Sequence, residues 1–164
     1  METESKILIV DDIAKNIQMA MNILKNEGYK MFYAKSGEMA LKLVDEHDFD
    51  LILLDIMMPD MNGFDVCVKL KSQAKTKKIP VIFLSGKDSS QDIEQAYECG
   101  GIDYVVKPFI TIELITKVNS YVRLKQLEDK FEKIKKLDEL AGQYPAGSLE
   151  RKAVDEEIKR LSKK

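Results

Sequence analysis

The feature that most constrains the fold is a run of four large apolar residues, 51–54, that leads directly into a carboxylate, Asp55. A turn-forming segment ending in Asn62-Gly63 follows. A continuous apolar run bounded by turn signals predicts a strand buried on both faces, as in parallel sheets. A charge at the edge of an apolar core is costly unless a partner binds it. The sequence therefore predicts a buried strand that ends in a binding group.

Short apolar runs alternate with amphipathic stretches throughout the first 120 residues. Strands are predicted at 6–12, 30–34, 51–55, 81–85 and 102–106. Helices are predicted after each strand, with capping residues at Ser36, Ser89 and Thr111. The second helix is expected to face the core with Met39, Leu41, Leu43 and Val44. Five strands that are each followed by a helix predict an α/β fold, a doubly wound parallel sheet with helices on both faces.

Composition limits the class of protein. The chain has 164 residues, of which 45% are apolar and a third charged, enough for one well-buried domain plus an appendage. No apolar run reaches the length of a membrane span, and the N-terminal METESK has no signal-peptide core, so we expect a cytoplasmic protein without a membrane partner. Cys67 and Cys99 have no metal-type spacing and are expected to be reduced thiols.

Charge is unevenly distributed along the chain. Residues 1–120 have 14 basic and 19 acidic side chains, whereas residues 121–164 have 12 and 9. Acids and bases alternate in this tail, which is typical of a solvated helix surface. The tail also lacks the three-helix apolar pattern and basic face of a helix-turn-helix module. We therefore expect no direct binding of nucleic acid.

Polar side chains occur where four of the predicted strands end. They are Asp11 and Asp12, Asp55, Ser85, and Lys107. Each of these residues alone could have an ordinary structural role, as a helix cap, a turn acid, a loop hydroxyl or a solvated lysine. Together they meet at one edge, because parallel sheets place functional groups at the carboxyl ends of their strands. Three carboxylates there would repel one another, and a Mg²⁺ ion shared with a phosphoryl group would relieve that repulsion. Lys107 would then supply a positive charge for the phosphoryl oxygens, and Ser85 a hydroxyl donor.

The motifs that carry these residues resemble the receiver domain of two-component response regulators. They are Asp11-Asp12, DIMMPDMNG around Asp55, Ser85-Gly86 and Lys107-Pro108-Phe109, and the resemblance covers roughly residues 5–122. It implies a flavodoxin-like (βα)5 sheet of strand order 2-1-3-4-5 and a receiver domain at 1–122. It also implies a histidine kinase or phosphotransfer protein as partner.

The resemblance implies a role for each site residue. Asp55 would be the phosphoacceptor, and Mg²⁺ would be held by Asp11, Asp12, Asp55 and the backbone carbonyl of Met57. The implied phosphate-binding and switch residues are Ser85, Gly86, Lys107 and Tyr104, and the Lys107-Pro108 peptide is expected to be cis. Phosphorylation would draw Ser85 inward and let Tyr104 turn, which changes the surface of the fourth helix, fifth strand and fifth helix.

Two positions are expected to tune the lifetime of the phosphoryl group. Met57 lies two residues after Asp55, and Lys87 two residues after Ser85. Because a methionine cannot orient an attacking water, we hypothesise a long phosphorylated lifetime.

Alternative functional interpretations each require a residue that this sequence lacks, so we do not expect an enzyme. A haloacid-dehalogenase-type phosphatase needs a second Asp at position 57, which is methionine. A phosphate-binding P-loop fails because Gly86-Lys87 is followed by Asp88 and lacks the upstream glycine. His47, the single histidine, lies near a predicted helix end and has no nucleophile to serve. A scaffold with a dead site remains as a rival, but none of the five site positions is missing.

The last helix is predicted to continue past Tyr121. An apolar seam recurs at spacings of three and four through Leu124, Leu127, Phe131, Ile134 and Leu137 or Ala141. This pattern favours a helical, coiled-coil-like extension at 123–164 that forms a parallel homodimer through the fifth helix and tail. The alternative is an amphipathic helix that folds back on its own domain. Ser148 is expected to cap a short C-terminal helix that runs to Ser162.

The segment 137–160 is similar to the opening of a diguanylate cyclase (GGDEF) domain. No GGDEF or GGEEF signature occurs, and the remaining residues are too few for that domain's core, so we expect no nucleotide cyclisation by this chain. Three readings stay open: a phosphorylation-controlled switch, a constitutively dimeric interaction module, and the truncated receiver part of a larger regulator such as a diguanylate cyclase.

Overall fold

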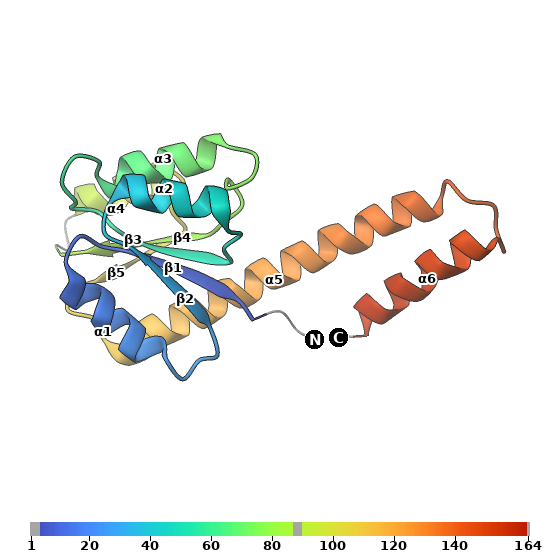
Figure 1. The fold of residues 1–164 in the computed structure, drawn as a ribbon, viewed down its shortest axis with the longest axis horizontal. Helices are drawn as coiled ribbons and strands as arrows, with labels where there is room; N and C mark the ends of the chain where they lie inside the picture. Colours follow the sequence, from blue (N-terminus) through green and yellow to red (C-terminus); the bar gives the residue numbers. More distant parts are fainter. Residues whose placement is uncertain (1–3, 87–89, 164) are drawn as a thin grey trace. The chain divides into compact units, whose positions relative to one another are not determined.

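Five parallel strands form one sheet. The computed structural model describes residues 4–86 and 90–163, and in this part of the chain the strands are ordered β2-β1-β3-β4-β5. They are β1 (Lys6–Val10), β2 (Lys30–Ala34), β3 (Leu51–Asp55), β4 (Val81–Ser85) and β5 (Asp103–Val106). The predicted strand order 2-1-3-4-5 is confirmed (Figure 1).

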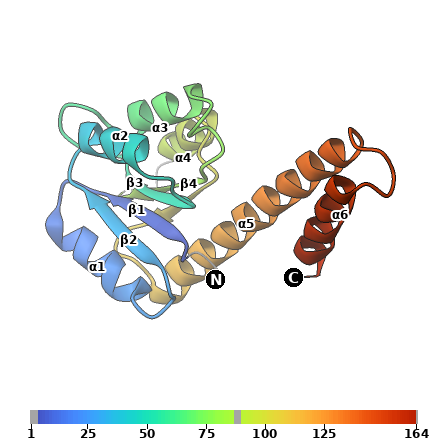
Figure 2. The same cartoon turned by 45° about the vertical axis from the view of Figure 1, so that its right-hand side comes forward.

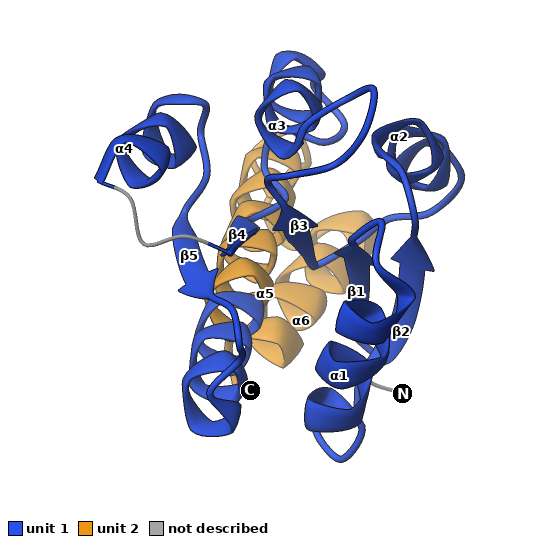
Figure 3. Ribbon diagram, turned by 90° about the vertical axis from the view of Figure 1, so that its left-hand side faces the viewer, with its two compact units in different colours: residues 1–122 blue, residues 123–164 orange. Residues whose placement is uncertain are grey.

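Helices cover both faces of the sheet. They are α1 (Ala14–Leu24), α2 (Gly37–Glu46), α3 (Gly63–Ser72), α4 (Ser90–Glu98), α5 (Thr111–Ala141) and α6 (Leu149–Ser162). Helices α2, α3 and α4 lie on one face, and α1 and the first turns of α5 lie on the other (Figure 3). The doubly wound α/β fold with a long fifth helix and a short C-terminal helix is therefore confirmed.

Two apolar layers explain the continuous apolar strands. Successive side chains of β3 alternate between them: Ile52 and Leu54 belong to the layer under α2–α4, and Leu51 and Leu53 to the layer under α1 and α5. Every residue of β3 and β4 is buried. A central strand of a doubly wound sheet has no solvent-facing side, so polar residues appear only where the strand ends.

Side-chain caps start the helices that follow β2 and β3. The Ser36 hydroxyl accepts a hydrogen bond from the Met39 amide at 3.1 Å, which confirms Ser36 as a cap. The second helix turns Ala40 and Val44 into the core, and Met39 is 41% exposed, so the expectation that Met39 faces the core is wrong. The predicted cap Ser89 lies outside the described residues.

The chain divides into two compact units, residues 1–122 and 123–164 (Figure 3). The second unit contains the last part of α5 and α6, which runs back beside it (Figure 2). Arg151 Nη1 donates to the Ala141 carbonyl at 2.9 Å, and Lys133 pairs with Glu157 at 3.7 Å. Among the helices of residues 4–86 and 90–163, none is both long enough and apolar enough to span a membrane.

Candidate functional site

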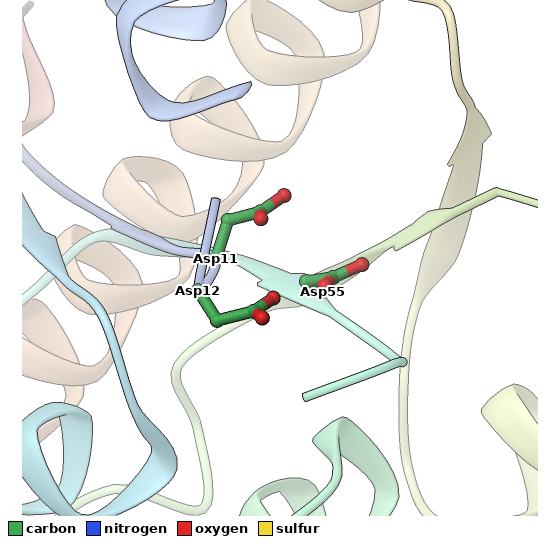
Figure 4. A group of neighbouring side chains, drawn as sticks. All are labelled: Asp11, Asp12 and Asp55. Carbon is green, nitrogen blue, oxygen red and sulfur yellow. The ribbon is translucent and has the colours of Figure 1, made fainter. Parts of the chain in front are cut away.

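The strand register brings the predicted site residues to the carboxyl edge of the sheet. Val10 pairs with Leu54, so the next residues, Asp11 and Asp55, are level with each other. Asp11, Asp12 and Asp55 each present a carboxylate oxygen within 4.8 Å of the other two, and Figure 4 shows the three side chains grouped at the ends of β1 and β3. Pairing of β1 with β3 therefore brings Asp55 beside two acids that precede it by more than 40 residues in the sequence.

Lys107 connects two of these acids. It follows β5, where Val106 pairs with Ser85. Its ammonium donates to Asp11 Oδ2 at 2.7 Å and to Asp55 Oδ1 at 2.8 Å. The Asp11 side chain is fully buried, that of Asp55 is 4% exposed and that of Lys107 is 17% exposed. Charge-assisted hydrogen bonds of this length are strong in such a water-poor setting.

The site is electrostatically unbalanced. Burial raises the pKa of Asp55, the hydrogen bond from Lys107 lowers it, and the charges of Asp11 and Asp12 raise it again, so that the net direction is upward. Burial acts to lower the pKa of Lys107, but its hydrogen bonds to Asp11 and Asp55 outweigh burial and raise it. One cation thus faces three carboxylates, which leaves an excess of negative charge that favours a second cation.

An oxygen of Asp12 marks where a cation fits. Asp12 Oδ1 is buried and, among the described residues, has no hydrogen-bond partner. A buried carboxylate oxygen without a partner is expensive, and a hard divalent cation satisfies it without adding bulk. The donor set of three carboxylates matches the oxygen ligands that Mg²⁺ takes in proteins, with waters in the remaining positions. The residues present therefore fit the predicted metal.

The loop after β1 holds Asp11 in place. Asp11 Oδ1 accepts hydrogen bonds from the Ile13 amide at 2.9 Å and from Asn16 Nδ2 at 3.2 Å. With Lys107 on the other oxygen, both oxygens of Asp11 are occupied by protein donors. Sequence reasoning missed Asn16. Its position in the first turn of a helix that starts beside two acids was the available signal.

The loop after β3 is held by a close backbone approach. Gly63 starts α3, and its amide donates to the Ile56 carbonyl at 2.9 Å. A Cβ at Gly63 would lie 2.2 Å from the carbonyl oxygen of Asp55. Asn62 caps the same helix by accepting from the Asp65 amide at 2.9 Å. The sequence indicated a turn at Asn62-Gly63, but not that Gly63 touches the backbone of Asp55.

The other predicted residues lie around this cluster. Ser85 ends β4 and is buried, and its carbonyl accepts from the Lys107 amide at 2.7 Å. Gly86 follows Ser85, and the Lys107-Pro108 peptide bond is cis. Met57 is 73% exposed, beside the end of β3. Lys87 lies outside the described residues.

Tyr104 lies away from the acids, within β5. Its ring makes an edge contact with Tyr97 of α4, with the ring centroids 6.4 Å apart. Lys117 of α5 places its ammonium 5.2 Å from the centroid of the same ring. The structure thus brings the acids and Lys107 together and places Tyr104 between α4 and α5.

A doubly wound α/β domain with an acidic cluster and a lysine at its carboxyl edge is the architecture of a receiver domain. The chain belongs to the response regulator receiver domain family, which matches residues 7–119. It is 38% identical over 125 residues to the response regulator PleD of Caulobacter vibrioides, covering 76% of this chain and 28% of that protein.

Two further proteins show the same likeness. A probable cyclic di-GMP phosphodiesterase of Vibrio cholerae is 38% identical over 127 residues, covering 77% of this chain and 29% of that protein. The solved receiver domain of the Francisella response regulator 1452 superposes with a TM-score of 0.68 at 32% identity, covering 73% of this chain and 98% of that one. This chain therefore spans less than a third of the length of these two curated relatives.

Proposed function

We propose that this chain is the phosphoacceptor of a two-component phosphorelay, in which Asp55 receives a phosphoryl group from a phosphohistidine. The observation that carries the proposal is the cluster of Asp11, Asp12 and Asp55 with oxygens within 4.8 Å of one another and Lys107 on two of them. Structural ion pairs alone do not account for the excess negative charge, or for the Asp12 oxygen that has no partner within residues 4–86 and 90–163.

The transfer is a displacement at phosphorus. A carboxylate oxygen of Asp55 forms a bond to phosphorus as the phosphorus–nitrogen bond of the phosphohistidine breaks, and the electron pair leaves with the imidazole nitrogen. Lys107 already reaches Asp55 Oδ1 and therefore lies within hydrogen-bond distance of oxygens on the arriving group. Ser85 and Gly86 supply donors from the end of β4 in this proposal.

Asp11, Asp12, Asp55 and the backbone carbonyl of Met57 are the residues that would hold Mg²⁺. When bound, Mg²⁺ offsets negative charge on the phosphoryl oxygens. Because the ion binds the folded acidic cluster, adding MgCl₂ is expected to raise the thermal midpoint of unfolding, by an amount equivalent to about 2.7 kcal/mol when the ion is at a hundred times its dissociation constant. Asp12→Asn should remove most of this increase, and an equal increase in wild type and variant would contradict the assignment.

The surface around the acids supports a protein as phosphodonor. Exposed apolar side chains follow the site residues within three positions of the sequence: Ile13 is 54% exposed, Met57 73% and Ile110 60%. A pocket of about 250 Å³ lies beside Lys107 and is lined partly by Met19 and Phe109. Apolar side chains around a polar centre are typical of interaction sites. We propose that a histidine kinase or a phosphotransfer protein docks here.

Phosphorylation then changes the surface of α4, β5 and α5. In this proposal Ser85 moves toward the phosphoryl group, Tyr104 turns, and its contacts with Tyr97 and Lys117 change. Shifting such an equilibrium from 1:99 to 99:1 requires about 5.5 kcal/mol of differential stabilisation. Several charge-assisted hydrogen bonds to a phosphoryl group reach that scale. The chain is then a switch rather than an enzyme.

We further propose that residues 1–122 form the receiver domain and residues 123–164 a helical extension that dimerises. Helix α6 packs beside the distal part of α5, where Ala141 is fully buried. The proximal seam is uncovered: Leu124 is 44% exposed, Leu127 52% and Phe131 70%. A stripe at spacings of three and four fits the same stripe of a second copy.

Two measurements test these proposals. Incubation with phosphoramidate and Mg²⁺ should add one phosphoryl group to the wild-type chain, detected by intact mass, and none to Asp55→Asn. Phosphorylation of Asp55→Asn to the wild-type extent would refute the acceptor assignment. The mass in solution with and without beryllofluoride then distinguishes a switch from a constitutive dimer, because a constitutive dimer has the same mass in both conditions.

The remaining alternative is that this chain is the receiver part of a larger regulator, because its relatives include a longer protein, a probable cyclic di-GMP phosphodiesterase.

A further inference from the structure

A second cluster of charged and aromatic side chains lies between β5 and α5, away from the acids. Its centre is Lys117 of α5, whose ammonium donates to Asp103 Oδ1 at 3.0 Å and to the Tyr104 carbonyl at 2.6 Å. The same ammonium pairs with Glu113 at 3.4 Å and lies 5.2 Å from the centroid of the Tyr104 ring. One side chain of α5 therefore contacts the backbone, the ring and the preceding carboxylate of the predicted switch residue.

Asp103 links a second turn of α5 to β5. Its other oxygen, Oδ2, accepts a hydrogen bond from the Tyr121 hydroxyl at 3.0 Å. Tyr121 stands one turn after Lys117 and directly before Val122, the last residue of the first compact unit. The Lys117 side chain is 25% exposed and that of Asp103 16%, so these contacts are partly shielded from solvent. They attach the final turns of α5 in this unit to the strand that carries Tyr104.

Lys117 remains charged in this setting. Burial acts to lower its pKa, but the hydrogen bond and charge of Asp103 and the contact with Glu113 outweigh burial and raise it. A lysine that faces two carboxylates and an aromatic ring does not supply a proton at neutral pH. Its contribution is the fixed positive charge that holds the ring and the carboxylate together.

We propose that Lys117 is a positioning residue that holds the Tyr104 ring in the unphosphorylated arrangement described here, so that rotation of Tyr104 loosens α5 from β5. The inference rests on the proposed function, because it assumes that Tyr104 is the switch. Rotation of Tyr104 about its first side-chain torsion removes the ring from Lys117 and from Tyr97. Lys117 then loses one of its partners, and the attachment of α5 through Asp103 weakens.

Linkage sets the direction of the effect. If Lys117 stabilises the unphosphorylated arrangement, its removal shifts the population toward the switched arrangement. Any ligand that binds the switched arrangement better then binds with higher affinity. Loss of one partly exposed cation–π contact corresponds to about a two- to fivefold change in population. A lysine that only supports the fold would leave this balance unchanged and lower the midpoint of unfolding alone.

The experiment uses ¹⁹F NMR of the full chain with its tyrosines replaced by 3-fluorotyrosine. Tyr104→Phe assigns the Tyr104 resonance, and beryllofluoride with Mg²⁺ is the probe of the switched state. The test variant Lys117→Met keeps the aliphatic stem and removes the charge. Lys117→Arg is the conservative rescue, and Lys69→Met removes a charge from the exposed surface of α3. Lys117→Gln replaces Lys117→Met if the latter does not fold.

In Lys117→Met we expect the Tyr104 resonance to lie closer to its beryllofluoride-bound position even before the probe is added. The apparent dissociation constant for beryllofluoride should be two- to fivefold lower than that of the wild type. Lys117→Arg and Lys69→Met should match wild type. An unmoved resonance with an unchanged or weaker dissociation constant overturns the inference. Failure of the wild type to bind beryllofluoride would overturn the proposed function, whereas normal binding by the wild type with an unmoved resonance in Lys117→Met would overturn only the inference. Asp55→Asn is the negative control, because it should not bind the probe.

Discussion

The contact between Gly63 and the backbone of Asp55 predicts a large effect of a single methyl group. In Gly63→Ala the new Cβ would lie 2.2 Å from the Asp55 carbonyl oxygen and 3.0 Å from the Ile56 Cα. Cβ contacts under 3.0 Å essentially never occur, so the two backbones must separate by roughly 0.8 Å. Neither neighbour is a flexible side chain, so the segment that carries the acceptor has to move.

The magnitude follows from two opposing contributions. Overpacking of this kind costs about 1–3 kcal/mol. Alanine in place of glycine returns about 0.4–1 kcal/mol by restricting the unfolded chain, so the free energy of unfolding should fall by up to about 2.5 kcal/mol. A displacement near 1 Å at a reacting group costs up to about a hundredfold in rate. We therefore expect phosphorylation of Asp55 by phosphoramidate to slow by about ten- to a hundredfold.

The assay measures both quantities on the same samples. Urea denaturation followed by circular dichroism gives the free energy of unfolding, and intact mass against time gives the phosphorylation rate. Gly142→Ala is the control, because its Cβ would lie 3.4 Å from the Glu139 carbonyl oxygen, close but without the severe overlap found at Gly63. This control should phosphorylate at the wild-type rate. A Gly63→Ala variant with wild-type stability and wild-type rate would refute the reasoning.

Three further predictions concern other parts of the chain. Because burial and neighbouring acids raise the pKa of Asp55, its charged form costs stability above that pKa; Asp55→Asn should therefore unfold at higher urea concentration at neutral pH in chelator. This advantage should shrink as the pH falls through the raised pKa toward about 3.9, and a constant advantage would be inconsistent with the charge argument. Met57→Asn should shorten the phosphorylated lifetime, measured as loss of the phosphoryl group by intact mass, and an unchanged decay rate would sink that idea. Phe131, 70% exposed on the seam, should be needed for the dimer, so Phe131→Glu is expected to give the monomer mass in solution without slowing phosphorylation, and a persistent dimer would exclude the seam as the interface.

The fold was predictable because its signals are local and repeated. The apolar runs at 51–55 and 81–85 are continuous, since both faces of β3 and β4 are covered, and turn residues bound them. The caps Ser36 and Ser148 follow from hydrogen bonds within three residues, and both form. The inner face of α2 was less predictable. A helix of ten residues with apolar side chains on several sides does not specify which side is covered, and Met39 is exposed.

The candidate site was predictable at the level of residue type and place. Asp11 and Asp55 lie at the ends of the neighbouring strands β1 and β3, and Lys107 follows β5, which pairs with β4. The carboxyl ends of parallel strands share one edge of the sheet. Asn16 and Gly63 were not predicted as parts of the site. The first acts through a single hydrogen bond to Asp11, and the second through a gap too small for a Cβ. The position of Asn16 in the first turn of a helix beside two acids was a weak signal, whereas the close approach at Gly63 leaves no pattern in the sequence.

The sequence alone determined the alternation of strands and helices, the acids at the strand ends and the amphipathic tail, because each depends on the chemistry of residues close together along the chain. Only the tertiary structure decided which acids Lys107 binds and that Lys117 reaches across to Asp103 and Tyr104. It also decided that an oxygen of Asp12 has no partner in the part of the chain that the structure describes. These are contacts between separate elements. Their distances depend on strand register, helix position and side-chain torsions, which are set by the packing of the whole domain rather than by any one segment.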